Sequence, residues 1–539
     1  MANKKYIFVV GGVMSGVGKG VATASIGKIL QAKGFNITAV KIDPYVNVDA
    51  GTMNPTEHGE VFVLDDGGEC DQDLGNYERF LDKNFTRANC LTTGKVYLSV
   101  INKERALKYG GKCVEVVPHI PLQIIEDINA AAKESKAEIV LIEIGGTVGE
   151  YQNILFLEAI RFLKLKHPKN VVTILVSYLP LRNKDNELKT KPTQYAVRTL
   201  NSTGIQPDIV LARASVPLDQ KRKEKIALNC NLNVDDVISA PDVDDVYEVP
   251  LVLEKADISK RILSKLGLRS RKRDLKEWSA LVGKIKKLKK TIRIGIVGKY
   301  FGTGNFILTD SYLSVIESVK HAAYEVGYKP EIDWIDASKQ GPLGKYHGII
   351  VPGGFGGRDV EGKMSAIRYA REKKVPFLGL CYGMQLATIE FARHAAGMNG
   401  ANSTEINKKT KYPVIDIIPE QIEKLKKANY GGTMRLGAYP AILGGGTIAQ
   451  KAYGSNKISE RHRHRYEVNP VYIKQLEDSG LVFSGKSPDG ILMEIIELPK
   501  SKHPFFVGTQ FHPELKSRPL TPHPLFREFI KAALAKKTR

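Results

Sequence analysis

The sequence contains no uninterrupted apolar run long enough to cross a membrane, although 42% of its 539 residues are hydrophobic. Its first residues, MANKK, lead into a short apolar run and not into a signal peptide. Cysteine is scarce, and the five cysteines are an odd number without close pairing, which argues against a disulfide framework. We therefore expect a soluble protein of a reducing compartment, the cytoplasm.

Acidic residues are also in deficit, because 58 Asp and Glu stand against 80 Lys and Arg, a net charge of +22. This charge fits nucleic-acid binding, several polyanionic small substrates, or a lysine-rich solvated surface. Part of the excess is local: residues 265–290 carry eleven Lys and Arg against Asp274 and Glu277. No aromatic interleaving and no known nucleic-acid module accompany it, so we expect no nucleic-acid partner.

Two stretches of the chain alternate short apolar runs with helical patterns. The first has nearly continuous β-branched runs at Tyr6–Val10, Ile37–Ile42, Ile139–Ile144, Val171–Ser177 and Ile209–Ala212. Such runs are typical of strands buried on both faces, and their alternation with helices predicts a parallel, doubly wound α/β sheet. A second alternation begins at Thr291. We predict α/β domains at 1–264 and 291–539, joined by a basic linker at 265–290.

A glycine-rich segment follows the first apolar run. Gly11–Gly20 reads GGVMSGVGKG and precedes a predicted helix at Val21–Ala32. Backbone N–H groups and the helix dipole would attract an anion there, and Lys19 adds a full charge. The spacing is not that of a regular P-loop, because Val13 stands where the first glycine belongs and Gly20 replaces the Ser or Thr that holds magnesium. The segment predicts a phosphate site whose metal ligand lies elsewhere; a turn that binds nothing is the alternative.

Charged residues at predicted strand ends are candidates for that metal site. Lys41 ends the second apolar run, and Glu143 follows the run that begins at Ile139. An acid at the end of a buried strand beside a phosphate loop is an arrangement that holds magnesium, although a carboxylate that accepts turn N–H bonds looks the same. Glu69, Asp71 and Asp73 form an acidic cluster that is either part of such a site or a solvated loop.

A second candidate site lies in the C-terminal half. Cys381 stands in GLCYG between an apolar run and a predicted helix, a pattern that predicts a nucleophile elbow. A helix N-terminus favours the thiolate, whereas an inert buried thiol is the alternative. His512 and Glu514 are two residues apart, so on extended chain they face the same way. The imidazole can take the thiol proton while the carboxylate fixes its tautomer, which predicts a Cys-His-Glu triad.

Two further segments complete this predicted site. Gly353–Gly356 is glycine-rich and ends a strand, so we expect Gly354 and Tyr382 to supply N–H groups to an oxyanion. The run RHRHRY contains His462 and His464 without a third ligand at suitable spacing, which argues against zinc. Its arginines suit a carboxylate such as that of an amino acid.

These motifs resemble one known family over nearly the full length and in family order. The C-terminal set PGGFG, GLCYGMQ and HPE is similar to class I glutamine amidotransferases. The N-terminal set resembles the synthetase domain of the CTP synthase family: GGVMSGVGKG, KIDPYVNVD, HGEVFV, EIGGTVG and KTKPTQ, with RHRHRYEVN further on. The resemblance implies a P-loop-like, dethiobiotin-synthetase-type parallel-sheet domain followed by a class I glutamine amidotransferase α/β domain.

The resemblance also implies an activity, the ATP-dependent amination of UTP to CTP in pyrimidine nucleotide biosynthesis. ATP would phosphorylate the uracil 4-oxygen, and ammonia from glutamine, or free ammonia, would displace the phosphate. A closed passage between the domains, with His58 near it, is expected to carry ammonia from Cys381. Further expectations are GTP as allosteric activator at a lid, Lys103–Gly111, CTP as product inhibitor, and a homotetramer that can form filaments.

Site residues follow from the resemblance, position by position. ATP is expected at Ser15, Gly16, Val17, Gly18, Lys19, Gly20, Lys41 and Asp73, and Mg²⁺ at Asp73 and Glu143. UTP and CTP are expected at Ser15, Glu150, Lys189, Lys191, Gln194 and Lys225. Glutamine is expected at Gly354, Tyr382, Gln385, Glu405 and Arg465, beside the triad of Cys381, His512 and Glu514.

One departure and two alternatives remain. The family commonly has Asp-Ile-Glu at its CTP site, where this chain has Glu150-Tyr151-Gln152, so the strength of CTP inhibition is an open question. A cobyrinic-acid-type enzyme would use the same two domain types to amidate a carboxylate, but it would not need KTKPTQ. A non-enzymatic, basic nucleic-acid-binding or filament-forming protein would leave the Cys-His-Glu set without a purpose.

Overall fold

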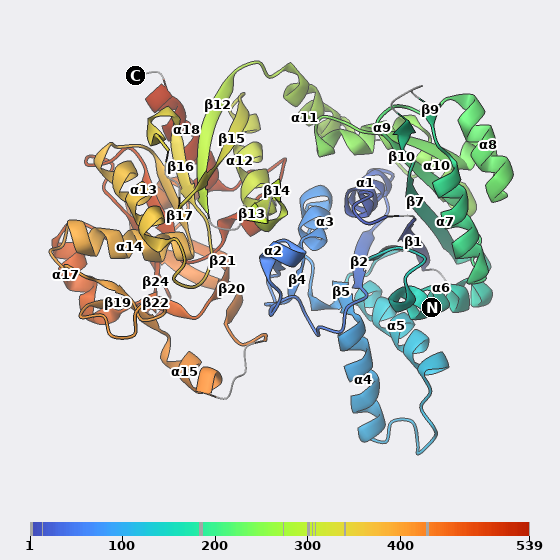
Figure 1. The fold of residues 1–539 in the computed structure, drawn as a ribbon, viewed down its shortest axis with the longest axis horizontal. Coiled ribbons are helices and arrows are strands. Elements are labelled where there is room, and N and C mark those ends of the chain that lie inside the picture. The colour runs from blue at the N-terminus through green and yellow to red at the C-terminus, as the bar shows by residue number, and fades with distance from the viewer. Residues whose placement is uncertain are drawn as a thin grey trace. The chain divides into compact units, whose positions relative to one another are not determined.

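The computed structural model describes residues 4–537 except 13, 183–186, 273, 299–301, 304–305, 308, 339–340 and 427–430. These residues form two compact units (Figure 1). The first contains Met1–Asp49 and Asp73–Val282, and the second contains Ala50–Gln72 and Gly283–Arg539. The predicted ranges 1–264, 265–290 and 291–539 place residues 50–72 in the first domain, whereas in the structure this segment packs with the second unit.

The first unit is built on a seven-stranded parallel sheet with the order β11-β10-β7-β1-β6-β2-β5. Its strands are β1 (Lys5–Gly11), β2 (Ile37–Asp43), β5 (Cys90–Thr92), β6 (Ile139–Ile144), β7 (Val171–Tyr178), β10 (Ile209–Ala214) and β11 (Val237–Pro241). A short hairpin adds β8 (Leu181–Arg182) and β9 (Glu187–Leu188). The predicted parallel α/β sheet is confirmed.

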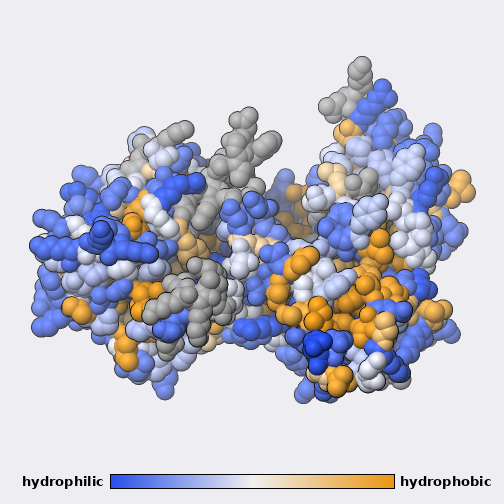
Figure 2. Space-filling model, turned by 60° about the horizontal axis from the view of Figure 1, so that its bottom comes forward, coloured by the Kyte–Doolittle hydropathy of each residue, from blue (hydrophilic) through white to orange (hydrophobic). Residues whose placement is uncertain are grey.

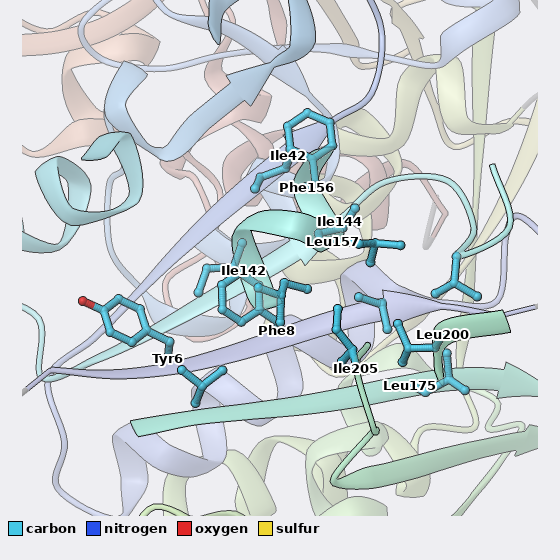
Figure 3. Packing of buried hydrophobic residues seen from close by; sticks show 14 of the residues in the cluster. Tyr6, Phe8, Ile42, Ile142, Ile144, Phe156, Leu157, Leu175, Leu200 and Ile205 are labelled. Carbon is cyan, nitrogen blue, oxygen red and sulfur yellow. The ribbon is translucent and has the colours of Figure 1, made fainter. Parts of the chain in front are cut away.

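The helices of this unit lie on both sides of its sheet (Figure 1). They are α1 (Lys19–Ala32), α3 (Asp73–Leu81), α4 (Thr93–Arg105), α5 (Val116–Glu134), α6 (Ile154–Lys166), α7 (Lys191–Ser202), α8 (Gln220–Cys230), α9 (Val249–Lys255) and α10 (Ile258–Lys265). The boundary between the units falls within α11 (Lys276–Lys287), after Val282. On one side, Phe8 and Ile142 of the sheet pack against Phe156 and Leu157 of α6 and Leu200 of α7 (Figure 3). Burial of this apolar area holds the helices on the sheet.

The register of the central strands brings the candidate residues to one edge. Every residue of β6 is buried, as its continuous apolar run predicts. Val9 of β1 and Lys41 of β2 both pair with Glu143 of β6. Because the strands are parallel, their carboxyl ends meet at the same edge, where the segment Gly11–Gly20 also begins.

The second unit contains a nine-stranded mixed sheet with the order β15-β12-β16-β17-β25-β24-β23-β20-β21. Its strands are β12 (Thr291–Gly298), β15 (Lys329–Asp336), β16 (Gly348–Val351), β17 (Phe377–Leu380), β20 (Arg435–Leu443), β21 (Lys457–His464), β23 (Val482–Lys486), β24 (Met493–Glu497) and β25 (Phe506–Thr509). Smaller sheets contain β13 (Gly302–Thr303) with β14 (Phe306–Ile307), and β18 (Asn402–Ser403), β19 (Pro413–Ile417) and β22 (Tyr466–Val468).

In the described part of the C-terminal half, the helices of this unit are α12 (Leu313–Glu325), α13 (Val360–Glu372), α14 (Tyr382–His394), α15 (Pro419–Lys426), α16 (Ile448–Tyr453), α17 (Ile473–Asp478) and α18 (Pro524–Lys537). Apolar clusters lie on the two sides of the large sheet. The strands β12, β16, β17 and β25 run parallel, so Cys381, which follows β17, and His512, which follows β25, lie at one edge.

The segment Ala50–Gln72 contributes helix α2 (Pro55–His58) and a hairpin of β3 (Val61–Val63) and β4 (Glu69–Asp71) to the second unit. The turn of this hairpin lies on β20, where the amide of Ala438 donates to the carbonyl of Asp65 at 2.8 Å. Gly437 has a φ of +93°, and a Cβ on it would lie 2.6 Å from the nitrogen of Gly67. A glycine is therefore required for this close approach.

No helix in the described ranges has both the length and the apolar character that crossing a membrane requires.

Candidate active site

The glycine-rich loop lies at the start of α1 in the first unit. Lys19 opens the helix, as the loop-then-helix pattern predicts, and its Nζ donates to the carbonyl of Gly146 at 2.7 Å. Burial lowers the pKa of Lys19, against the opposing effect of Glu143. Ser15 and Gly16 are exposed beside it, while Val13 lies outside the described residues. The loop thus presents backbone and one buried cation at the edge of the sheet.

A buried group of charges lies beside the loop. Lys41 forms an ion pair with Asp73, lies 3.2 Å from Oε1 of Glu143, and lies 3.6 Å from Asp43. Tyr77 donates a hydrogen bond to Glu143. Burial, reinforced by the charge of Asp73, raises the pKa of Glu143 to about 7. Burial also opposes ionisation of Asp73, but Lys41 holds the pKa of that carboxyl below its ordinary value.

These acids fit a magnesium ion that is shared with phosphate groups. Mg²⁺ is usually held by one or two carboxylates together with waters and substrate phosphates. Asp73 and Glu143 supply two carboxylates near the loop, and Asp73 starts α3. Among the described residues no group of three or more His, Cys, Asp or Glu is arranged to hold a metal by itself. The donor set therefore suits a metal that arrives with a nucleotide.

Glu69 and Asp71, the other acids of the predicted cluster, do not join Asp73. Both belong to β4 in the second unit. Nε of Arg463 donates to Glu69 at 2.8 Å, and Oδ2 of Asp71 lies 3.7 Å from Nδ1 of His58. The predicted cluster is therefore divided between the two units, because their boundary falls between Gln72 and Asp73.

Arg213 was not predicted, yet it lies against the loop. Its Nη1 donates to the carbonyl of Val17 at 3.4 Å, and Nη2 donates to Asp242 at 2.6 Å. A cavity of about 20 Å³ beside it is lined by Gly18 and by apolar residues of α1, β10, β11 and α9. Since Arg213 lies near the carboxyl end of β10, the rule that ligands bind at strand ends could have identified it.

The residues predicted for UTP and CTP occupy two places in the first unit. Oε1 of Glu150 accepts from the amide of Thr147 at 2.7 Å. Glu150 therefore lies near the glycine-rich loop, because Lys19 of that loop donates to the neighbouring Gly146. Gln152 donates to the other oxygen of Glu150 at 2.6 Å, so the uncharged residue at the departure from the family pattern is bonded to the remaining carboxylate. The side chain of Ser15 is exposed near the start of the loop.

The second group surrounds β9 and α7. A hydrogen bond from Lys189 lowers the pKa of Glu187, and the charges of Arg222 and Lys225 act in the same direction. Lys189 and Lys225 therefore lie near one acid, although they are 36 residues apart in the sequence. Gln194 donates to the hydroxyl of Thr190 at 3.1 Å within the start of α7, and Lys191 is exposed.

The predicted elbow is present in the second unit. Cys381 has φ 49° and ψ −100° between β17 and α14, which is a strained conformation for a residue with a side chain. A Cβ on Gly383 would lie 2.0 Å from the carbonyl of Val351, so only glycine fits after this turn. The thiol lies at the N-terminal end of α14, as the elbow pattern predicts.

His512 and Glu514 complete the constellation. Nδ1 of His512 lies 2.7 Å from Oε1 of Glu514. Although burial opposes it, the charges of Glu514 and Cys381 raise the pKa of His512 to about 10. The imidazole is thus held protonated at neutral pH by its partner Glu514.

The surroundings of the thiol include a residue that the sequence reading missed. Nε2 of Gln510 donates to Sγ of Cys381 at 3.7 Å, and Sγ lies 3.8 Å from the carbonyl of Arg463. Gln510 precedes His512 by two residues, so the alternation of an extended chain could have placed both on one face. A cavity of about 80 Å³ lies beside Cys381 and is also lined by Glu60 of the Ala50–Gln72 segment.

The five residues predicted for glutamine surround the elbow to different degrees. Oε1 of Glu405 accepts from the amide of Gly356 at 2.7 Å, and the hydroxyl of Tyr382 donates to the carbonyl of Gly356 at 2.5 Å. Gln385 donates to the carbonyl of Tyr466 at 3.0 Å. Gly354 lines the cavity beside Cys381.

Arg465 lies between β21 and β22, and its side chain donates hydrogen bonds. Its Nη1 donates to Gln421 at 2.5 Å and its Nη2 to the hydroxyl of Thr433 at 3.0 Å. Both of these partners are neutral polar groups.

Comparisons with known proteins match both units. A family profile described as "CTP synthase N-terminus" matches residues 5–268, and one described as "Glutamine amidotransferase class-I" matches residues 307–532. A CTP synthase of Methanococcus maripaludis is 52% identical over 545 residues, which cover 99% of this chain and 100% of the relative. The chain belongs to the CTP synthase family.

A second CTP synthase relative agrees with this assignment. A CTP synthase of Methanocaldococcus jannaschii is 51% identical and covers 99% of this chain and 99% of its own length. Among solved structures, the glutaminase domain of Trypanosoma brucei CTPS with bound acivicin is 36% identical, covers 45% of this chain and 94% of its own, and has a TM-score of 0.41.

The family assignment confirms several sequence-based predictions. The resemblance to CTP synthases, the two α/β domain types and the assignment to a glutamine-dependent ligase that converts UTP to CTP are confirmed, and ATP is the co-substrate. A carboxylate-amidating enzyme of the cobyrinic-acid type is not favoured, nor is a non-enzymatic nucleic-acid-binding protein. The roles of individual site residues stay predictions.

Proposed function

We propose that the first unit phosphorylates the 4-oxygen of UTP with ATP, and that ammonia released at Cys381 displaces this phosphate to give CTP. One observation carries the proposal: a phosphate-binding loop with buried Lys41, Asp73 and Glu143 occurs in the same chain as a Cys-His-Glu triad. The first set of residues suits phosphoryl transfer, and the second suits release of ammonia from an amide.

The loop and its neighbours would bind ATP. The loop residues Ser15 to Gly20 offer backbone N–H groups to the phosphates, and Lys19, at the start of α1, offers a cation. Arg213 lies against the loop, and its guanidinium could stack on the purine ring of a nucleotide bound there. Asp73 and Glu143 would hold Mg²⁺, which when bound neutralises phosphate charge. Lys41 would hold the transferred group.

UTP would lie between the loop and the hairpin that contains β9. Lys189, Lys191 and Lys225 offer cations to its triphosphate, and Gln194 offers both a donor and an acceptor to a base or sugar. Glu150 would accept from a hydroxyl or an amino group. Because product CTP carries the same triphosphate, it would compete for these lysines and inhibit.

The triad would release ammonia from glutamine in two steps. His512 already carries the proton, and Sγ of Cys381 attacks the side-chain amide carbon of glutamine as the thiolate. The amides of Gly354 and Tyr382 would donate to the oxyanion, after which His512 returns the proton to the leaving nitrogen. Water then cleaves the thioester, and glutamate leaves with the free thiol restored.

Glu405, Gln385 and Arg465 would hold the amino-acid end of the substrate. The carboxylate of Glu405 suits an ammonium group, and the guanidinium of Arg465 suits an α-carboxylate. The cavity beside Cys381 would receive the ammonia, and its walls at Val61, Val63 and Val315 would disfavour protonation there.

Assembly and regulation are further parts of the proposal. Large apolar side chains are exposed on α4 to α7 of the first unit, at Leu98, Ile101, Leu122, Ile154 and Tyr195. Figure 2 shows apolar surface gathered on this side of the first unit. Such a patch suits contact between identical chains, in keeping with a homotetramer in the cytoplasm. GTP would activate through Lys103–Gly111, at the end of α4.

The experiment incubates the purified full chain with UTP, ATP, Mg²⁺ and glutamine, and then measures CTP and glutamate. The same chain is offered carboxylate acceptors in place of UTP. Formation of CTP with one glutamate per CTP is expected, together with ammonium-driven synthesis when glutamine is left out. Amidation of a carboxylate without CTP formation would overturn the proposal.

A further inference from the structure

Strand β21 lies directly beside the triad of the second unit. The amide of His512 donates to the carbonyl of Arg461 at 2.8 Å, and Sγ of Cys381 lies 3.8 Å from the carbonyl of Arg463. Among the described strands of the large sheet, β21 stands at the end of the order and pairs with β20. On the side of β21 that faces away from β20, the position of its backbone therefore depends on the contacts of its side chains.

The side chain of Arg461 is the main such contact. It is completely buried, and its Nε donates to Oδ1 of Asp65 at 2.6 Å. Its Nη1 donates to the carbonyl of Val63 at 3.1 Å and, at 3.4 Å, to that of Leu515, the residue after Glu514. The guanidinium also lies over the ring of Phe62 at 5.4 Å. Arg461 thus joins the β3–β4 hairpin to both ends of the His512–Glu514 turn.

Asp65 is held in place independently of Arg461. Its carbonyl accepts from Ala438 on β20, and Nζ of Lys516 lies 3.5 Å from its carboxylate. Lys516 itself donates to the carbonyl of Ser459 on β21 at 2.7 Å. The carboxylate of Asp65 therefore lies between two cations, Arg461 on β21 and Lys516 in the turn that carries Glu514.

We propose that Asp65 and Arg461 are positioning residues for glutamine hydrolysis, an inference that rests on the proposed role of Cys381, His512 and Glu514. A buried guanidinium that loses its carboxylate moves to recover a partner. Movement of Arg461 shifts the carbonyl that fixes His512 and releases the carbonyl of Leu515. Attack by Cys381 depends on that alignment, so kcat falls. Glutamine binding at Glu405 and Arg465 does not contact Asp65, so KM is retained.

Asp65→Asn is the decisive variant, because Asp65 is partly exposed and the change keeps the shape of the side chain. Glutamate release is measured for kcat and KM, ammonium-driven CTP formation for the other half-reaction, and the unfolding midpoint for stability. We expect the glutaminase kcat to fall by about tenfold to a hundredfold. KM for glutamine and ammonium-driven synthesis are expected to stay within about twofold of the wild type, since neither uses Asp65.

Two further variants separate positioning from general destabilisation. Asp66→Asn changes the neighbouring exposed acid, whose Oδ1 accepts from the amide of Gly68 at 3.1 Å, and should leave kcat unchanged. Asp65→Glu keeps a carboxylate and should recover part of the lost kcat. The proposal is overturned if Asp65→Asn keeps the wild-type kcat, or if ammonium-driven synthesis falls equally. A wild type that makes no CTP would instead overturn the proposed function.

Discussion

Nδ1 of His512 lies 2.7 Å from Oε1 of Glu514, and this hydrogen bond leaves Nε2 as the ring nitrogen available to the thiol of Cys381. The tautomer and the orientation of the base are thereby fixed before substrate arrives. The amide of His512 is held separately by β21. Cys381, His512 and Glu514 all belong to the second unit. The glutaminase half-reaction can therefore be tested separately from the synthetase half-reaction.

The first prediction concerns the nucleophile. Cys381→Ala is expected to lower glutamine-dependent CTP synthesis by more than about a thousandfold, because no thioester can form. Ammonium-driven synthesis should stay near the wild-type rate. The matched control is Cys230→Ala, since burial raises the pKa of the Cys230 thiol to about 11 and makes it inert. CTP assays with each nitrogen source decide the matter; equal loss with ammonium would contradict the assignment of two sites.

The second prediction concerns pH. The pKa of His512 is raised from 6.5 to about 10, so the imidazole stays protonated across neutral pH. A raised pKa contributes stability that is complete below pH 6.5 and is lost as the pH rises through about 10. We expect the NMR signals of the His512 imidazole to stay those of the protonated ring from about pH 7 to pH 9. In Glu514→Gln the ring should lose its proton within that range, and a wild-type ring that loses its proton there as well would refute the role of Glu514.

The third prediction concerns Lys41. Lys41→Met leaves Asp73 and Glu143 without their shared cation in a buried place. We expect ammonium-driven CTP synthesis to fall by at least about a hundredfold, because charge on the transferred phosphoryl group is no longer balanced. Basal glutaminase activity should be retained. Lys83→Met serves as the control, since Lys83 bonds to Asn36 and the carbonyl of Ile37 at the amino end of β2.

The fourth prediction uses two buried acids that share Arg435. Nη2 of Arg435 donates to Glu494 at 2.7 Å, and Nη1 donates to Glu467 at 3.3 Å. Burial and the charge of Glu494 raise the pKa of Glu467 well above its ordinary value. Burial opposes ionisation of Glu494 as well, but His462 and Arg435 hold its pKa below the ordinary value. A proton taken up by this pair therefore binds Glu467 in preference to Glu494.

The two glutamine substitutions should then differ in their cost. Glu467→Gln puts a neutral amide of the same shape in place of the acid whose ionised form is disfavoured, so the unfolding midpoint of the second unit should change little. Glu494→Gln leaves Arg435 without its anion and should cost about 3 kcal/mol. Calorimetry of both variants at pH 7 tests this order. The reverse order would show that the proton resides on Glu494.

The sheets could be predicted from the sequence because their strands obey a local rule. Ile139–Ile144 is buried on both faces, so its apolar run matches β6 without a shift. The elbow at Cys381 was also predictable, because glycines on both sides mark a turn that few other residues can enter. These features depend on residues that are neighbours along the chain.

Other features depend on contacts between distant residues, and no local pattern contains them. Glu69, Asp71 and Asp73 look like one acidic cluster, yet Glu69 pairs with Arg463, 394 residues further on. The packing of Ala50–Gln72 with the second unit is of the same kind. Arg213 was missed because an arginine that follows an apolar run can have many roles. Its contact with the carbonyl of Val17 in the glycine-rich loop is visible only in the structure.

The hairpin from Ala50–Gln72 has a consequence for building chimaeras between relatives. A seam placed only in the linker would combine the β3–β4 hairpin of one parent with the β20 and β21 strands of another. The Asp65–Arg461 pair and the close approach of Gly67 to Gly437 would then join surfaces that were never selected together. A functional exchange has to transfer residues 50–72 together with residues 283–539. The exchanged unit is therefore encoded by two separate segments of the gene, although the two segments form one compact unit in the structure.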